Sequence, residues 1–197
     1  MPVSHESVLY DVHDFKVYPL LTDDVGEAPT YGPGIDVPGI AEVSTSPNFA
    51  TNELKGDARV LAKKGRVDRF ELDATYGKLS LDVLKTILGG AITDLGDVSA
   101  QWILTGDNST PYFKAEFKIS DLDQGLGDLH VVLYKCNLTD GTLISGQTDE
   151  FGQPELSLEA IPLDGTIPAV TGPPAVPAME NPMIRVALLA ARTPLSE

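Results

Sequence analysis

Cysteine is almost absent from this chain of 197 residues, in which Cys136 is the one thiol. A single thiol cannot form a disulfide within the chain, so a small fold held together by several disulfide bridges is excluded. Because Cys136 lies in the apolar stretch 129–138 (LHVVLYKCNL), we interpret it as a small buried hydrophobic side chain rather than a nucleophile.

Long apolar runs are also absent. No stretch approaches the roughly 20 apolar residues that a membrane helix requires. The first residues (MPVSHESVLYDVHD) include neither the basic region nor the apolar region of a signal peptide. We therefore expect a protein without a membrane segment that folds in a reducing cytoplasm.

Positive charge is scarce. The chain has 14 lysines and arginines against 29 aspartates and glutamates, which gives a formal net charge of −15. Proteins that hold DNA neutralise its phosphates with lysine and arginine, so a large DNA-binding surface is excluded. Solubility is the simplest interpretation of this charge, and a surface that must not retain nucleic acid is the more specific one.

Catalytic and ligand-binding signatures are missing as well. The chain has no G-x-S-x-G motif, and carboxylate pairs carry no information in a chain with 29 acids. The loop 121–128 (DLDQGLGD) departs from an EF-hand because Gly125 stands at the fifth position, Leu126 at the sixth and Val132 at the twelfth. No metal-ligand spacing fits His5, Asp11, His13 and Asp14. We predict no catalytic residue, cofactor or metal ion, and so no enzyme.

What the sequence does contain is strand alternation and frequent turns, with 18 glycines and 15 prolines. The clearest strand is 67–76, where period two indicates a sheet with one buried and one exposed face. The buried side is predicted to carry Phe70, Leu72, Ala74 and Tyr76, and the exposed side Arg69, Glu71 and Asp73. Residues 79–90 then change to helical spacing, with Ser80 as a candidate N-cap and Gly89-Gly90 as the end of the helix.

Further strands are predicted at 14–21, 40–45, 100–104, 112–119, 129–138 and 156–163. Residues 184–192 fit a final strand or the start of a short helix, and we favour the strand because the other elements need a partner. In 112–119 we expect Lys114, Glu116 and Lys118 on the solvent face, and we expect 91–99 to be a turn-rich passage. The predicted fold is mainly β: one domain, 1–197, with an antiparallel β-sandwich or partial barrel and one flanking α-helix. Its extensions are an N-terminal arm (1–13), an excursion (48–66) and a proline-rich extended segment (164–183).

The excursion concentrates the positive charge of the chain next to several acids. We interpret it as a surface that pairs with an acidic neighbour, including another copy of the chain, in preference to DNA. Its candidate contact residues are Glu53, Leu54, Lys55, Asp57, Arg59, Lys63, Lys64 and Arg66.

An ordered series of short motifs resembles the major tail tube protein of long-tailed (siphovirus-type) bacteriophages. The motifs are Tyr31-Gly32, Asp36-Val37-Pro38-Gly39, 44–47 (STSP), 53–57 (ELKGD), Phe70-Glu71-Leu72 and 79–88 (LSLDVLKTIL). The resemblance covers 14–104, and its most specific part is E-L-x-G-D followed by an alternating strand and the short helix.

The resemblance implies the tail tube fold and a structural virion protein, made in the host bacterial cytoplasm. Hexameric rings of such a protein stack into a hollow conduit that delivers the genome into the host. The implied partners are other copies, the tape-measure, tail-tip and tail-terminator proteins, and genomic DNA only in non-specific transit. The excursion would then stack rings, and Arg69, Glu71 and Asp73 would face the lumen or a neighbour.

Two alternatives stay open at this point. One is another ring- or tube-forming structural protein, such as a tail-completion, decoration or type VI secretion-like tube subunit. The other is a β-sandwich module that binds a carbohydrate or another small ligand.

Overall fold

A computed structural model describes residues 9–56, 59–78, 80–94, 96, 99–121, 128–146, 148, 152–169 and 178–188. These residues form antiparallel strands and one helix, which confirms the mainly β fold class. Some sequence predictions fall on residues outside the described ones, namely Asp57 and residues 1–8, 170–177 and 189–192. In the described part of the chain, no helix has the length and apolar character that crossing a membrane requires.

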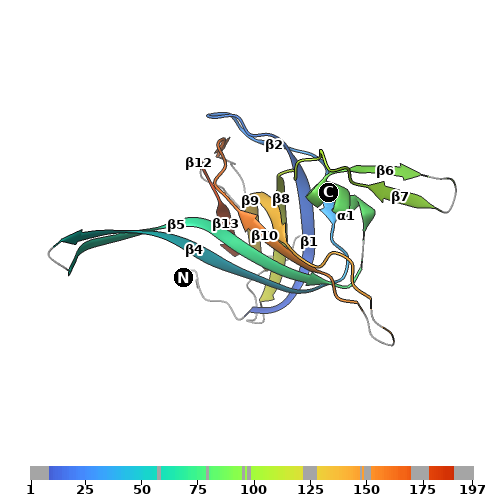
Figure 1. Ribbon diagram of the computed structural model, residues 1–197, viewed down its shortest axis with the longest axis horizontal. Helices are drawn as coiled ribbons and strands as arrows, with labels where there is room; N and C mark the ends of the chain where they lie inside the picture. Colours follow the sequence, from blue (N-terminus) through green and yellow to red (C-terminus); the bar gives the residue numbers. More distant parts are fainter. Residues whose placement is uncertain are drawn as a thin grey trace, which may run out of the picture.

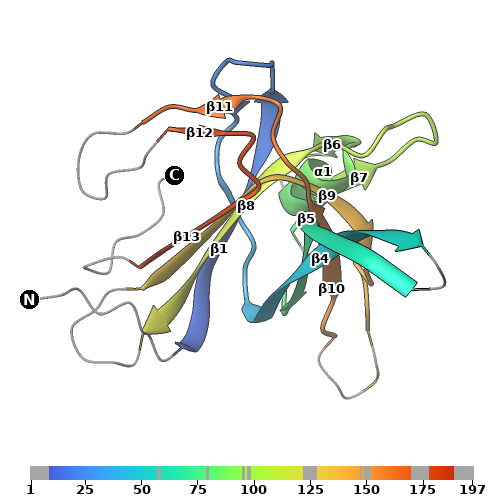
Figure 2. The same ribbon diagram turned by 90° about the vertical axis from the view of Figure 1, so that its left-hand side faces the viewer.

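One large sheet contains most of the strands (Figures 1 and 2). Its order is β2 (Thr30–Tyr31), β1 (Leu9–Thr22), β8 (Phe113–Asp121), β9 (Leu129–Asp140), β10 (Glu155–Ala160), β5 (Arg59–Tyr76) and β4 (Ile40–Gly56). Two further strands join it, β3 (Ile35–Asp36) on β1 and β13 (Ile184–Leu188) on β9. Residues 9–13, which the sequence assigned to an arm, are in fact part of β1 and pair with β8.

The sheet forks at the middle of β9. Along the edge of β9 that faces away from β8, β13 pairs with residues 129–133 and β10 pairs with residues 136–140. Tyr134 donates its amide to the carbonyl of Met183, while the carbonyl of Lys135 accepts the amide of Ile161. Figure 2 shows β10 and β13 diverging, with the small sheet of β11 (Thr166–Ile167) and β12 (Met179–Glu180) apart from both.

The main core lies under α1 (Leu81–Leu88) and the inner faces of β1, β5, β8, β9 and β10. On β5 the predicted alternation is confirmed from Glu71 to Tyr76, because Leu72, Ala74 and Tyr76 are buried while Glu71 and Asp73 are exposed. Arg69 and Phe70, predicted exposed and buried, are both half-buried. The helix is confirmed too, and Gly89 ends it with φ 82°. Ser80 stands at the N-cap position as predicted, but its side chain makes no capping hydrogen bond.

The passage after the helix was predicted to consist of turns, but the structure has a hairpin there. β6 (Ala91–Asp94) pairs with β7 (Ala100–Ile103), and this hairpin projects beside α1 (Figure 1). The Nε1 of Trp102 donates to the carbonyl of Gly89 at 2.8 Å and so attaches the hairpin to the end of the helix.

The second face of β8 differs from its prediction. Glu116 and Lys118 are buried and Lys114 is nearly so, although alternation placed all three in solvent. The physical reason is a second apolar cluster on that side of the sheet, formed by Val132, Tyr134 and Leu163 with Leu20, Ile167 and Met179 packed around it. Ion pairs of Lys114 with Glu116 and of Lys118 with Asp14 compensate the buried charges.

Candidate functional site: a projecting hairpin and the groove at its root

The outer halves of β4 and β5 extend away from the body of the protein (Figure 1). We call residues 48–56 and 59–67 the projecting hairpin. Its strands pair with each other from Phe49 and Val67 to Gly56 and Arg59. At about 3.3 Å per residue, eight residues of paired strand reach roughly 25 Å. The sequence-predicted excursion therefore forms a long two-stranded arm.

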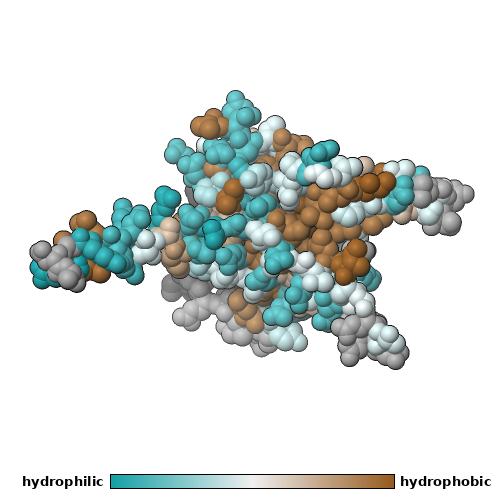
Figure 3. Space-filling view, in the orientation of Figure 1, coloured by the Kyte–Doolittle hydropathy of each residue, from teal (hydrophilic) through white to brown (hydrophobic). Residues whose placement is uncertain are grey.

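Apolar side chains are exposed along this arm. Figure 3 shows hydrophobic atoms among hydrophilic ones near its outer end. The exposed side chains are Phe49 (61%), Leu54 (62%), Val60 (52%), Leu61 (53%) and Val67 (38%). A two-stranded hairpin is marginally stable by itself, and exposed apolar side chains lose contact with water when another molecule covers them.

The hairpin is also basic. Residues 48–67 carry five cationic side chains against Glu53 and Asp57, so the segment has a net charge of +3 in a chain of −15. Glu53 lies 3.2 Å from the Nζ of Lys63 and 3.6 Å from that of Lys55. Among the described residues, Arg59 and Lys64 form no ion pair. The arm therefore presents unneutralised positive charge.

At the root of the hairpin, one face of the sheet is acidic. Arg69 forms ion pairs with Glu159 and, at 3.8 Å, with Glu71. Asp73 accepts a hydrogen bond from the Ser157 hydroxyl at 2.7 Å. Three carboxylates thus share this face with the single guanidinium of Arg69.

Two adjoining hollows lie on this face, with volumes of about 520 and 280 Å³. Both are lined by Arg69 and Glu159, so we treat them as one root groove that this ion pair divides. Its remaining lining comprises Arg66, Val67, Asp68, Ile161 and Pro162 on one side and Glu71, Asp73, Thr139, Ser157 and Leu158 on the other.

The structure brings together some of the predicted site residues. Glu53, Lys55 and Lys63 meet on one face of the hairpin. Leu54 and Lys64 are also exposed residues of the hairpin. Sequence reasoning missed Glu159 and Ser157. They reach the groove because β10 pairs with β5, and no local pattern indicates a register between residues more than 80 positions apart.

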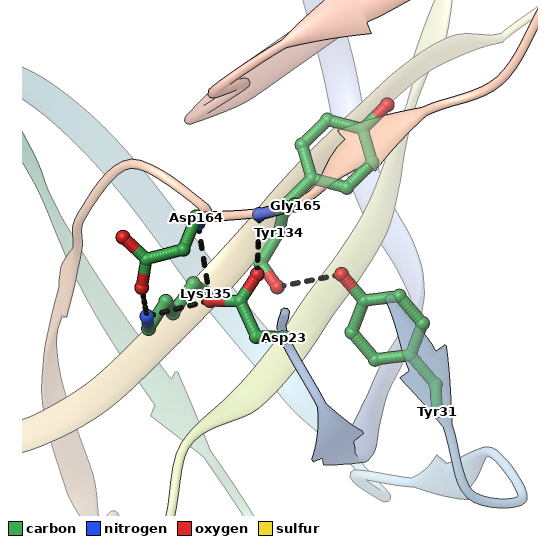
Figure 4. Close-up of polar contacts among 6 residues, drawn as sticks. All are labelled: Asp23, Tyr31, Tyr134, Lys135, Asp164 and Gly165. Atoms are coloured by element: carbon green, nitrogen blue, oxygen red, sulfur yellow. Dashed lines mark hydrogen bonds and ion pairs between the residues drawn. The ribbon is translucent and has the colours of Figure 1, made fainter. Parts of the chain in front are cut away.

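A second polar cluster is centred on the buried side chain of Lys135 (Figure 4). The Nζ of Lys135 donates to Asp23 at 2.6 Å and to Asp164 at 2.8 Å. Asp23 also accepts the amides of Asp164 and Gly165. We call Asp23, Lys135 and Asp164 the clasp, because they join the β1–β2 loop, the fork of β9 and the segment that follows β10.

The clasp is suited to holding the fold together rather than to catalysis. Burial opposes the charged form of Asp23, but hydrogen bonds from Lys135 and from the two amides outweigh it and lower the pKa of that carboxyl. Burial likewise opposes the charge of Lys135, yet its hydrogen bonds to the two aspartates raise the pKa of its amine. An amine held in its charged form at neutral pH is neither a base nor a nucleophile.

A buried carboxylate, Glu116, predicts a pH effect. Its burial disfavours charge, but the neighbouring His130 ring, whose Nε2 lies 3.7 Å from the carboxylate, and the ammonium of Lys114, 2.5 Å away, lower its pKa from 4.5 to about 2. A lowered folded pKa contributes stability that is present above pH 4.5 and is lost as the pH falls toward 2. We expect a contribution of roughly 3 kcal/mol at neutral pH.

The measurement is urea unfolding of wild type and Glu116→Gln at a series of pH values, followed by circular dichroism. The stability difference between the two proteins should be largest near neutral pH and should shrink below pH 4.5. Two stability curves that run parallel through the acid range would contradict this role of Glu116.

Comparison with known proteins found no family model and no curated protein that matches the chain. Function must therefore be argued from the surfaces of the molecule. Within the described residues, no group of three or more histidine, cysteine, aspartate or glutamate side chains is placed to hold a metal ion. The features with a clear physical need for a partner are the projecting hairpin and the root groove.

Proposed function

We propose that this chain is the subunit of a hollow tube, the major tail tube protein of a long-tailed bacteriophage. Its copies would form hexameric rings that stack into the conduit for genome delivery. The observation that carries the proposal is the projecting hairpin, which holds five exposed apolar side chains away from the core of its own subunit. Such an arm gains stability when another molecule covers its apolar side chains.

The energy available from such a contact is substantial. Fully burying a leucine or phenylalanine side chain contributes roughly 1.5–3 kcal/mol. Because the five side chains are already partly covered, a neighbour would gain on the order of 5 kcal/mol per hairpin by covering them. Repetition of this contact in every subunit supports a large assembly.

The free edge of β4 supports the same proposal. β4 pairs with β5 along one edge, and no strand in the described residues pairs with its other edge. Open strand edges attract further strands, and a ring of subunits removes that exposure. A contact between two different surfaces of the same subunit repeats head to tail, and so either closes into a ring or continues as a stack.

Charge supports the conduit part of the proposal. A wall that carried many cations would retain DNA by releasing its counterions, whereas this chain has a net charge of −15. Arg69, Glu71 and Asp73 would face the lumen or a neighbouring copy, and DNA would pass without specific binding. The tape-measure, tail-tip and tail-terminator proteins would be the remaining partners, as the sequence resemblance implies.

Electron microscopy of the purified protein tests the proposal. We expect rings or tubes of uniform bore, and sedimentation should show that they grow with protein concentration. Rings that never stack would favour a tail-completion or decoration protein. A chain that stays monomeric at high concentration would overturn the proposal and favour a ligand-binding module, for which a thermal-shift screen against the root groove is the next measurement.

A further inference from the structure

We propose that the root groove of one copy receives the cationic face of another copy's projecting hairpin. This inference rests on the proposed self-assembly and specifies which two surfaces meet. The groove has an excess of negative charge and the hairpin an excess of positive charge. The occupant that we propose is therefore a second copy of this chain.

The donor surface follows from the register of the hairpin. Successive alternate residues of β4 are Asn52, Leu54 and Gly56, and their partners on β5 are Lys64, Ala62 and Arg59. Asn52, Leu54 and Gly56 share one face of β4, and the register shifts between Leu54 and Lys55, where β5 has Leu61 as an extra residue. Because of this bulge, Arg59 lies on the same face of the hairpin as Lys64, beside the exposed Leu54. This face offers two cations with no ion pair in the described residues and one large apolar side chain between them.

The acceptor surface has the opposite charge. In the groove the guanidinium of Arg69 lies near the carboxylates of Asp68, Glu71 and Glu159. Asp73 is exposed, and the hydrogen bond it accepts from Ser157 leaves its charge uncompensated. Counting Arg66, the lining has four carboxylates against two guanidinium groups. A neighbouring lysine and arginine would balance this excess.

Size and reach agree with this pairing. A hollow of about 520 Å³ joined to one of 280 Å³ has the volume of a site for a small ligand, and so admits more than one long side chain. The hairpin cannot fill its own groove, because its two strands run outward from the groove and stay paired as far as Gly56 and Arg59, with register shifts only after Asn48 and after Leu54. Only another copy can bring Arg59 and Lys64 to Glu71 and Asp73.

Charge reversal tests the pairing in the full-length chain. The donor variant is Arg59→Glu with Lys64→Glu, and the acceptor variant is Glu71→Lys with Asp73→Lys. We expect each to raise the protein concentration at half assembly by at least about tenfold, measured by sedimentation velocity. Combining the four substitutions should restore assembly, because opposite charges then meet again. Raising NaCl from about 0.05 M to about 0.5 M should weaken wild-type assembly in the same direction.

Matched controls separate this contact from general charge effects. Lys78→Glu with Lys85→Glu changes the net charge as the donor variant does, and Asp94→Lys with Asp107→Lys changes it as the acceptor variant does. All four control residues are exposed and lie outside both surfaces. We expect the controls to assemble at the wild-type concentration, and circular dichroism should show that every variant is folded. Should the acceptor variant not fold, the donor variant and the salt series decide the question.

The outcomes distinguish this inference from the proposed function. Rings or tubes that are lost on reversal and restored by the combined variant support both. Wild-type tubes that neither reversal nor salt affects would overturn the groove contact and leave the proposed function standing. A charge-dependent dimer that never forms rings would support the groove contact and overturn the tube.

Discussion

Deleting residues 52–63 and closing the gap with an Asn-Gly turn should leave a folded monomer that no longer forms rings or tubes. Among the deleted residues that the structure describes, Asn52 pairs with the retained Lys64 and the other paired residues pair with each other. The inner parts of β4 and β5 keep their pairing and their place on the core. Asn-Gly favours the tight turn that a shortened hairpin needs. Circular dichroism should report a strand content that is lower only by the deleted strand residues, and sedimentation should show a single monomeric species.

A second variant separates the length of the arm from its apolar surface. Leu54→Ser with Leu61→Ser keeps the hairpin at full length but removes two of its most exposed apolar side chains. It should weaken assembly without abolishing the fold, because both side chains are more than half exposed in the single subunit. Normal tubes from the deleted chain would place the essential contact elsewhere on the molecule.

The largest effect on stability is expected from the clasp. Replacing Lys135 by alanine leaves Asp23, whose side chain is only 9% exposed, without its cation. Breaking a buried ion pair by removing one partner costs about 3–5 kcal/mol, because the remaining charge stays buried. Urea unfolding of Lys135→Ala against wild type measures this loss.

Two further variants make the prediction specific. Asp23→Asn combined with Lys135→Met should be more stable than Lys135→Met alone, since no unpaired charge then remains at Asp23. Lys78→Met, at an exposed position, should change the unfolding free energy by no more than about 0.5 kcal/mol. A loss below about 1 kcal/mol in Lys135→Ala would show that the clasp contributes little.

The clasp also has a pH window. The pKa of Asp23 is lowered from 3.8, so its contribution is present above that pH and is lost as the pH falls further. The pKa of Lys135 is raised from 10.5, so its contribution is present below that pH and is lost as the pH rises beyond it. The difference between wild type and Lys135→Ala should therefore be largest between these limits.

Local sequence patterns predicted the features that depend on neighbouring residues, which are strand alternation and the position of the helix. The alternation of β5 separated Leu72 and Ala74 from Glu71 and Asp73, because a strand with one covered face must alternate. The apolar stripe and the terminal glycine of α1 gave its position within the chain. Alternation failed on β8, where Glu116 and Lys118 are buried, since the pattern cannot report that a second layer covers the other face.

Long-range contacts escaped prediction for a different reason. The clasp joins Asp23 to Lys135, and the groove joins Arg69 to Glu159, across separations that no periodicity spans. Each depends on which strands become neighbours and in what register. The fork of β9 escaped prediction as well, because an apolar strand such as LHVVLYKCNL indicates coverage but not two partners on one edge.

The strand order has a consequence for the time course of synthesis. β4 and β5 adjoin in sequence and can pair as soon as they have been made, but Glu159 follows Val67 by about 90 residues. At about 5–20 residues per second, the inner edge of β5 waits several seconds for β10. A nascent chain therefore possesses the cationic arm before it possesses the groove. Under the proposed contact, newly made chains would offer an arm to finished subunits before they could accept one, and this asymmetry would give assembly a direction in time.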